Sequence, residues 1–464
     1  VAGLTGAAAG AATAFGMVQQ YGVAGNSGSE KAERAVVHMP STTEFKGITD
    51  KTRAYRAGEG AKWTKPVVIS TAQYEPLAAT LRNRLGSDDY SADKGPTLSL
   101  GKFKSGDPNI KFNWQRVVGR KVVFIFDTVD TDRFFEQLAV LQALQGFAVP
   151  DGDDKTTKWK TYIEHGKYSW GRAAHIAVVL PWYRPCQMER TSRWQFKNEQ
   201  WTNTDPAGEW LDSPNALYFA RLLCTPGSVP PLPGPSASLD NMPLNPLWRP
   251  PVELLFVELH EEVPVSHSVS DLGATIKTER FVPYFLDKFK GKRAYPGKAN
   301  MYVLFPDRGA FDRYAASVMQ VLSLDSDHVI FIQKTRVGEQ ISQVEKLFYE
   351  QGEGKPHGEK VSFKETDHVL IIDDFTNSGS TLFGAVKLCN KLTDGEPNVS
   401  IFVSHLVATY DPKVAEGLLQ KIHALGPKCR FFTTNSIPST TDLIKGDPQV
   451  EVVDISDFIA DLVQ

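Results

Sequence analysis

The chain has 464 residues, and its charges nearly cancel, since 51 Lys and Arg face 54 Asp and Glu for a formal net charge of −3. With 41% hydrophobic and 11% aromatic residues it can build packed cores, which excludes wholesale disorder. At about 150 residues per domain, the length predicts two to three domains. The balanced charge offers no basic face, so we expect no nucleic-acid partner. The four cysteines are far apart and form no CxxC pair, which argues against a structural zinc site or a disulfide framework and fits a reducing compartment.

The N-terminal segment differs from this average. Residues 1–29 contain no charged side chain and are rich in Ala and Gly. Residues 1–24 are long enough to span a bilayer, and Gly6 and Gly10 have the small-xxx-small spacing of packed membrane helices, but Ala and Gly are only weakly apolar. A transit-peptide remnant or flexible tail is the favoured interpretation, and membrane contact of residues 1–24 is the alternative. The polar residues that follow show no period, so residues 1–65 are interpreted as an N-terminal extension with a polar arm.

From Pro66 onward, short apolar runs alternate with amphipathic stretches, which predicts a parallel α/β sheet. Residues 225–251 hold so many prolines that they cannot form a helix or a central strand, so they are interpreted as an inserted loop or rigid arm. Residues 66–275, with this insertion, form the first predicted domain. Its strands are predicted at 66–70, 117–126, 175–183 and 252–259, and its helices at 71–86, 132–147 and 214–223.

The same alternation repeats over residues 276–464, the second predicted domain. Two α/β halves of similar build suggest a tandem repeat of one fold. The predicted fold class is therefore α/β, with two tandem Rossmann-like domains and parallel central sheets. The strands of the second half are predicted at 301–305, 328–332, 368–375, 399–406, 429–435 and 450–456, and the helices at 280–289, 309–322, 380–392, 412–425 and 457–464.

The strongest local signal is VLIIDDFTNSGSTLFGAV at residues 369–386. An apolar strand ends in Asp373 and Asp374, and small polar residues with a glycine lead into a helix. Backbone N–H groups and hydroxyls at a helix N-terminus bind anions, so this loop predicts a phosphate site. The acids lie where open α/β sheets bind ligands, and they suit sugar hydroxyls or Mg²⁺. The loop residues are Thr376, Asn377, Ser378, Gly379, Ser380 and Thr381.

This string resembles the phosphoribosyl-diphosphate (PRPP) signature of the phosphoribosyltransferase fold. From about Pro66 to its end, the chain resembles ribose-phosphate diphosphokinase, the PRPP synthetase. Details such as the SGST ending lean towards the plant-type branch of that family. The resemblance implies two tandem phosphoribosyltransferase-like domains. Further blocks that resemble the family, in its order, are FKSGDPN at 103–109, PWYRPCQMER at 181–190, FVELH at 256–260, FPDRGAFDRYA at 305–315, QKTRVGEQ at 333–340 and TTNSIP at 433–438.

The reaction that the resemblance implies is the transfer of pyrophosphate from ATP to the C1 hydroxyl of ribose 5-phosphate, which gives PRPP and AMP. Lys334 and Arg336, on a mobile loop in the family, would be the catalytic charges beside the transferring group. The ribose 5-phosphate would be held by Asp373 and Asp374 at its hydroxyls and by the loop of residues 376–381, with 377–381 at the 5-phosphate. Mg²⁺ is the implied cofactor, and His260 and Asp307 are the residues implied around it.

The ATP side departs from the family pattern. Gln187, Met188 and Glu189 stand where the family often has Arg-Gln-Asp, although Glu189-Arg190 matches the plant-type branch. Phe103 keeps an aromatic ring that could stack on adenine, so Phe103, Gln187, Glu189 and Arg190 are the predicted ATP-side residues. The family's acid before the histidine block is replaced by Glu258. By this comparison the ribose-phosphate half is nearly intact and the ATP half has drifted.

Two functions remain open from the sequence. One is an active PRPP synthetase that binds ATP and ribose 5-phosphate and self-associates into a homo-oligomer. The alternative is a recruited, inactive accessory or structural subunit of a large organellar or membrane complex, bound to other subunits through residues 1–65 and 225–251. A phosphoribosyltransferase acting on a base is less favoured, because the chain has two α/β halves where that class usually needs one. An organellar location is expected, with the mitochondrion favoured over the plastid.

Overall fold

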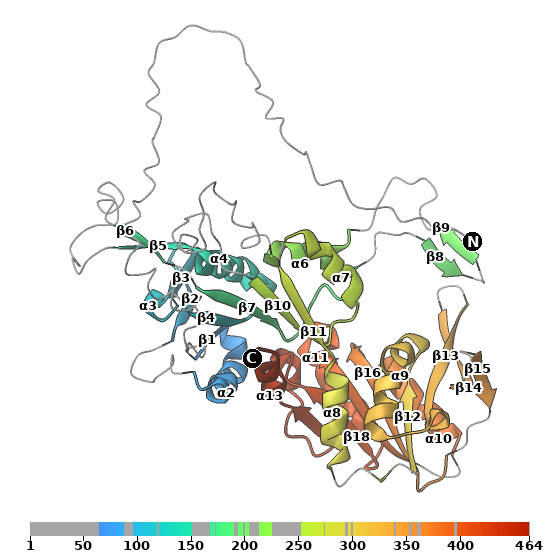
Figure 1. The fold of residues 1–464 in the computed structure, drawn as a ribbon. Coiled ribbons are helices and arrows are strands. Elements are labelled where there is room, and N and C mark those ends of the chain that lie inside the picture. The colour runs from blue at the N-terminus through green and yellow to red at the C-terminus, as the bar shows by residue number, and fades with distance from the viewer. Residues whose placement is uncertain are drawn as a thin grey trace, which may run out of the picture. The chain divides into compact units, whose positions relative to one another are not determined.

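The structure is a computed structural model, and it describes the greater part of the chain from residue 65 onward (Figure 1). The described residues are 65–87, 96–117, 120–150, 168–171, 173–189, 194–197, 200–203, 213–224, 252–272, 274–292, 296–297, 300–337, 340–351, 355–359, 363–393 and 397–463.

The first half of the chain folds around a five-stranded sheet in which all neighbouring strands are parallel. Its central strands are nearly continuous apolar runs, the pattern of parallel strands that are buried on both faces. In spatial order the strands are β1 (Val67–Ser70), β4 (Lys121–Ile125), β7 (His175–Leu180), β10 (Val252–Val257) and β11 (Thr275–Glu279). One face packs on α4 (Phe134–Gln145), α6 (Asn215–Cys224) and α7 (Glu262–Val269), and the other on α2 (Glu75–Leu85).

The second half folds around an eight-stranded sheet with a parallel centre and an antiparallel edge of two strands. In spatial order the strands are β15 (Lys355–Glu359), β14 (Gln340–Gln351), β13 (Val329–Val337), β12 (Met301–Phe305), β16 (His368–Thr376), β17 (Asn398–Leu406), β18 (Cys429–Thr434) and β19 (Val450–Val453). One face packs on α10 (Ser380–Lys391) and α11 (Pro412–Ala424), and the other on α8 (Phe281–Lys290) and α9 (Arg308–Leu322).

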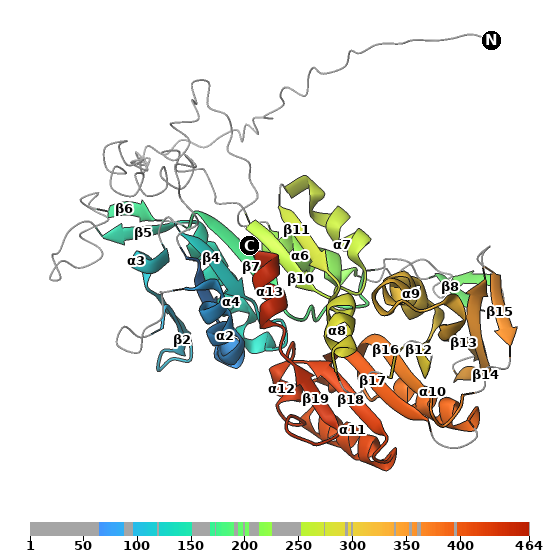
Figure 2. The ribbon, with the colours of Figure 1, turned by 60° about the horizontal axis from the view of Figure 1, so that its bottom comes forward.

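One hydrophobic core contains side chains from both sheets. Within it, the rings of Phe285 on α8 and Phe402 on β17 stack with centroids 3.7 Å apart. The helix α13 (Ser456–Val463) packs on α2, where Arg84 and Asp457 form an ion pair of 2.6 Å (Figure 2). A late segment of the chain therefore covers a face of the first sheet.

The predicted α/β fold class with two parallel-centred sheets is confirmed, because the predicted strands and helices of both halves occur at their predicted places. The antiparallel edge was not predicted: residues 333–340, expected to form a loop, lie largely in the ribbon of β13 and β14. β-branched residues such as Thr335, Val337 and Ile341 favour this extended pairing.

Several short elements escaped the sequence analysis because they are local hairpins and single turns. The hairpins are β2 (Leu98–Lys102) with β3 (Pro108–Phe112), β5 (Phe147–Pro150) with β6 (Tyr168–Gly171), and β8 (Trp194–Lys197) with β9 (Gln200–Asn203). The short helices are α3 (Trp114–Val117), α12 (Pro438–Thr441), η1 (Ala72–Tyr74), η2 (Thr131–Arg133), η4 (Ser270–Leu272), η6 (Ser326–His328) and η7 (Ala408–Tyr410).

Some predictions fall outside the described residues, namely those for the N-terminal segment up to residue 64 and for the proline-rich insertion 225–251. Among the residues that are described, no helix is both long and apolar enough to cross a membrane. All four cysteines are described and are free thiols.

Candidate functional site

The predicted phosphate loop lies between the carboxyl end of β16 and the start of α10. Gly379 is the residue before the helix and has a φ of +73°, a left-handed conformation that glycine adopts without strain. A Cβ at Gly379 would also lie 2.3 Å from the ring of Phe383, so any other residue would force the ring or the loop to shift. The first N–H groups of α10 and the hydroxyls of Ser378, Ser380 and Thr381 therefore form an anion cradle at a helix N-terminus.

Two hydrogen bonds from neighbouring segments hold this loop in place. The Lys421 ammonium on α11 donates a hydrogen bond of 3.0 Å to the Ser378 carbonyl. The side-chain oxygen of Asn377 accepts from the Thr409 N–H at 3.3 Å. Because Lys421 contacts a backbone atom of the loop itself, it adds positive charge next to the cradle without lining it.

Asp373 and Asp374 are adjacent in β16 but have different surroundings. Asp374 is nearly buried; its Oδ2 lies 2.6 Å from His260 Nδ1 and 2.5 Å from an Arg313 nitrogen, and its Oδ1 accepts from the Phe375 N–H at 3.0 Å. Burial alone would raise the pKa of Asp374, but the bond to His260 and the charge of Arg313 lower it below its usual range. Burial and the negative charges of Asp374 and Asp307 instead raise the pKa of Asp373 well above the usual range.

Asp307 begins α9 as its N-cap. Its Oδ1 accepts a hydrogen bond of 3.0 Å from the Ala310 N–H. Helix capping alone is a sufficient structural reason for an Asp at this position. In this molecule Asp307 also lies at the wall of the cavity near Asp373, where a second carboxylate makes a cation favourable.

His260 comes just after β10 of the first half and reaches Asp374 of the second half. Burial lowers its pKa, but the hydrogen bond to Asp374 and the charge of that carboxylate outweigh burial, so the pKa of His260 is raised overall. Since Nδ1 lies 2.6 Å from a carboxylate that stays ionised, Nδ1 is the donor. A neutral His260 therefore has its lone pair on Nε2, the arrangement by which carboxylates orient metal-binding histidines.

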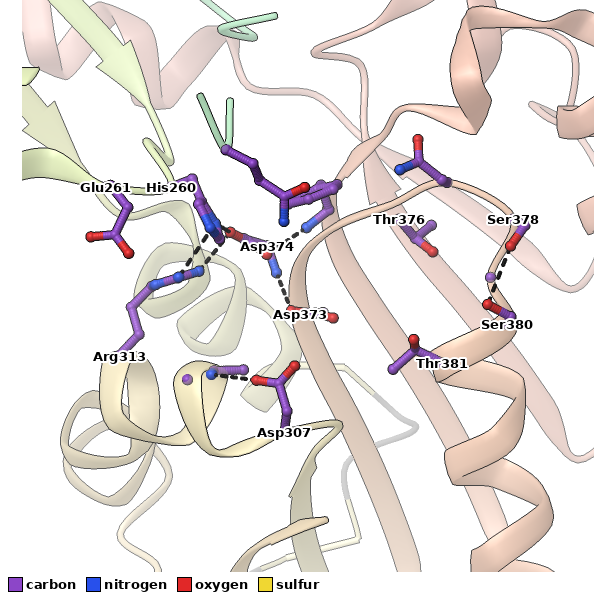
Figure 3. A pocket seen from close by; sticks show the side chains of 16 residues that line it. His260, Glu261, Asp307, Arg313, Asp373, Asp374, Thr376, Ser378, Ser380 and Thr381 are labelled. Carbon is purple, nitrogen blue, oxygen red and sulfur yellow. Dashed lines mark hydrogen bonds and ion pairs between the residues drawn. The ribbon is translucent and has the colours of Figure 1, made fainter. Parts of the chain in front are cut away.

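These side chains surround one open cavity of about 660 Å³ (Figure 3). In the figure Asp374 turns towards His260 and Arg313, whereas Asp373 lies on the side of Asp307. The cavity brings together residues that the sequence predicted for both substrates, one of them the ATP-side Gln187. The predicted site residues that line the cavity are Gln187, His260, Asp307, Asp373, Asp374, Thr376, Asn377, Ser378, Gly379, Ser380 and Thr381.

Other predicted residues do not line this cavity or are only partly described. Phe103 is 56% exposed in the turn between β2 and β3. Glu189 is buried, and its carboxylate accepts from the Gln187 N–H at 3.1 Å. Arg190 lies outside the described residues. Lys334 and Arg336 have backbones paired with Gln343 and Ile341 in the β13–β14 ribbon, and their side chains lie outside the description.

The donor set fits the implied Mg²⁺. This ion prefers carboxylate and phosphate oxygens, and Asp307 and Asp373 offer carboxylates whose mutual repulsion a cation would relieve. His260, the other residue that the resemblance implies around Mg²⁺, lines the same cavity. By contrast, Asp374 is already neutralised by protein groups, so it adds little to a metal site.

From the sequence, no site role was assigned to Arg313, Glu261 or Glu258, although Arg313 stands within a family block and Glu258 was named as a departure from the family. Arg313 and Glu261 line the cavity. The Glu258 carboxylate is buried and accepts from the Phe281 and Val282 N–H groups at 2.7 and 3.0 Å. The signal in the sequence for Arg313 and Glu258 was their place in the blocks FPDRGAFDRYA at 305–315 and FVELH at 256–260, and Arg313 also stands directly before the buried Tyr314 of α9.

No family model matches the chain. The chain is 28% identical over 374 residues to ribose-phosphate pyrophosphokinase 4 of Oryza sativa subsp. japonica, which covers 79% of this chain and 87% of that protein. It is 27% identical over 414 residues to ribose-phosphate pyrophosphokinase 3, mitochondrial, of Spinacia oleracea, covering 84% and 75%. The crystal structure of phosphoribosylpyrophosphate synthetase from Mycobacterium smegmatis superposes with a TM-score of 0.54 at 18% identity, covering 86% of this chain and 98% of that one.

The chain is PRPP synthetase-like. Its sequence resembles the plant enzymes, and its fold is that of the mycobacterial synthetase. The PRPP synthetase-like character that the motifs predicted is therefore confirmed. The loop that first suggested it occupies the cavity, at the carboxyl edge of the second sheet where α/β folds bind ligands.

Proposed function

We propose that the protein is a PRPP synthetase that transfers pyrophosphate from ATP to ribose 5-phosphate and releases AMP. One observation carries the proposal: a single cavity holds the anion cradle of α10, the Asp373–Asp374 pair, Asp307 and His260. A sugar phosphate needs a phosphate site and hydroxyl acceptors a few ångströms apart, and this cavity has both. The similarity to two ribose-phosphate pyrophosphokinases supports the same substrates.

In the proposed reaction, the C1 oxygen of the sugar forms a bond to the β-phosphorus of ATP. The bond between that phosphorus and the α–β bridging oxygen breaks, and AMP leaves with the bonding electrons, while the hydroxyl proton passes to solvent or a nearby base. The protein acts mainly by positioning and by charge. The α10 cradle holds the 5-phosphate, and Lys334 and Arg336 supply positive charge to the transferring group. Bound Mg²⁺, held by Asp307, Asp373 and His260, would neutralise phosphate charge.

The direct test is an AMP-forming assay. The purified chain is incubated with ATP, ribose 5-phosphate and Mg²⁺, with and without inorganic phosphate. We expect equal amounts of AMP and PRPP, and neither product when ribose 5-phosphate is omitted. A well-folded protein that gives no AMP under any of these conditions would contradict the proposal.

The recruited-subunit alternative rests on residues 1–65 and 225–251, almost all of which lie outside the described residues. Nothing in the comparisons or in the described part of the chain favours it over synthesis of PRPP. Relatives named mitochondrial and chloroplastic support an organellar location, and the mitochondrion is our proposal within that class. Self-association and membrane contact of residues 1–24 stay predictions, testable by light scattering and by flotation with vesicles.

A further inference from the structure

The two adjacent acids of the cavity are engaged to different degrees. Both oxygens of Asp374 have protein partners: Oδ1 takes the Phe375 N–H, and Oδ2 takes His260 Nδ1 and the Arg313 guanidinium. These three contacts take up most of the roughly four acceptor sites of a carboxylate, so little capacity is left for sugar hydroxyls. Asp373 uses Oδ1 for the Asp374 N–H at 3.1 Å, and its side chain also bonds to that of Asp374, but it has no cationic partner among the described contacts.

Arg313 is the group that balances the charge of Asp374. The side chains are 14% and 5% exposed, so the pair is largely removed from water. Removing one partner of such a pair leaves an uncompensated buried charge, which is strongly unfavourable. The Arg313 guanidinium also lies 3.3 Å from His260 Nδ1. Because Nδ1 already donates to Asp374, Arg313 holds the carboxylate rather than the imidazole.

Asp373 has the opposite environment. It lies at the cavity wall with Asp307, and the negative charges of Asp307 and Asp374 act on it. Cations and hydroxyl donors are therefore the ligands that this carboxylate favours. The contrast between two neighbouring acids arises from His260 and from Arg313, both of which reach Asp374.

We infer that Arg313 is a positioning residue that reserves Asp374 for His260, so that Asp373 alone of the two acids binds the sugar. This inference rests on the proposed function for the identity of the sugar phosphate. Asp374 then acts through His260, a residue that the proposed function assigns to Mg²⁺. The two acids, which look equivalent in the sequence, have separate tasks.

The test uses Asp373→Asn, Asp374→Asn, Arg313→Met and the double variant Arg313→Met/Asp374→Asn. Ribose 5-phosphate binding is measured by calorimetry without ATP, and kcat and KM are measured for each variant. We expect Asp373→Asn to weaken binding about tenfold or more, the loss of one charge-assisted hydrogen bond. Asp374→Asn should change binding less than about threefold but lower kcat at least about tenfold, because it frees His260.

Arg313→Met should weaken ribose 5-phosphate binding about tenfold, since the bare Asp374 charge repels the anionic ligand. Adding Asp374→Asn to Arg313→Met should restore the affinity for ribose 5-phosphate to that of Asp374→Asn alone. Arg313→Lys should lose less affinity than Arg313→Met. The matched control is Arg221→Met, which breaks an exposed bidentate pair with Asp271 outside the cavity and should leave binding unchanged. The inference would be overturned if Asp373→Asn and Asp374→Asn weakened binding equally. It would also be overturned if the loss of affinity in the double variant were the product of the losses in Arg313→Met and Asp374→Asn.

Thermal unfolding of the same four proteins needs no ligand. Arg313→Met should lower the melting temperature, and Asp374→Asn added to it should raise the melting temperature again. If the unchanged chain does not bind ribose 5-phosphate while this thermal coupling is present, the proposed function fails and the pairing stands. If the sugar binds and the coupling is absent, the inference fails and the function stands.

Discussion

The buried carboxylate of Glu258, at the end of β10, accepts a hydrogen bond of 2.7 Å from the hydroxyl of Tyr314 on α9. The same carboxylate takes the Phe281 and Val282 N–H groups at the start of α8 and the Ser404 hydroxyl on β17. Glu258 thus joins the segment directly after β10, which carries His260, to three elements of the second half. Glu258, which stands where the family has a shorter acid, reaches four donors: the Tyr314 and Ser404 hydroxyls and the Phe281 and Val282 N–H groups.

Replacing Glu258 with Ala should therefore lower the free energy of unfolding by about 3 kcal/mol, because several buried donors lose their shared acceptor. Glu258→Gln keeps one acceptor oxygen and should cost about 1 kcal/mol. Urea denaturation followed by circular dichroism measures both. Glu279→Ala, at an exposed position of β11, is the control and should be nearly neutral. A loss of less than about 0.5 kcal/mol for Glu258→Ala would show that the contacts are not needed.

Gly379→Ala tests the phosphate cradle. The added methyl group would need a left-handed conformation and would overlap the Phe383 ring, so the loop must shift. We expect the Kd for ribose 5-phosphate to rise at least about tenfold. Gly417→Ala is the matched control, because nothing lies near its Cβ position within α11 and alanine favours helix there. Unchanged affinity in Gly379→Ala would place the 5-phosphate elsewhere.

Lys421→Met should raise the KM for ribose 5-phosphate about two- to fivefold, with a smaller effect on the KM for ATP. The reason is that Lys421 donates to the Ser378 carbonyl and adds an exposed positive charge near the cradle. The difference between the two proteins should shrink in high salt, since exposed charges are screened. Lys413→Met, at the other end of α11, serves as the comparison. An effect of equal size in Lys413→Met would mean that the general charge of the helix matters and the contact does not.

Lys334→Ala should lower kcat by about 10²–10³, the usual effect of removing one group that stabilises a transition-state charge. Initial rates of AMP formation measure it. The exposed Lys364, away from the cavity, supplies the control variant Lys364→Ala. If Lys334→Ala raises KM and leaves kcat intact, this lysine binds substrate without stabilising the transferring group.

The stability of the fold should depend on pH through His368, which is buried and bonds to the Ser400 hydroxyl at 2.9 Å. Burial lowers the pKa of His368 to about 4. An unfolded histidine has a pKa of about 6.5, so below that pH the unfolded chain takes up a proton that the folded chain does not. This term is fully favourable above pH 6.5 and is lost as the pH falls towards 4.

Between pH 7 and 5 the loss should reach about 2 kcal/mol from this residue. His368→Gln keeps a hydrogen-bonding side chain without a titrating ring, so its unfolding free energy should fall less over this interval. The exposed His267 provides the control His267→Gln. The measurement is the urea midpoint of unfolding at pH 7 and at pH 5. If the unfolding free energy of His368→Gln falls as much over this interval as that of the unchanged protein, this account is refuted.

The phosphate loop and its acids could be predicted because the whole signal is local. A strand, two acids, small residues and a helix start follow one another in the chain, and this order alone determines where the N–H groups of α10 point. The same holds for Asp307, whose capping role and whose place at the cavity both follow from the strand–helix junction.

The Arg313–Asp374–His260 cluster could not be predicted in this way. Asp374 is 61 residues from Arg313 and 114 from His260. Such contacts leave no periodic pattern, since they depend on how the end of β10 meets α9 and β16. The β13–β14 ribbon was missed for another reason: the resemblance of residues 333–340 to the family implied a mobile loop, whereas in this chain their backbone pairs with β14.

The packing of α13 on α2 has a consequence for synthesis of the protein. Arg84 and Asp457 are 373 residues apart in the chain, yet they belong to one interface. During translation, the face of α2 that α13 covers stays open to water until almost all of the described residues have left the ribosome. The first half therefore emerges first but completes its packing last. During that interval its exposed apolar surface can bind chaperones.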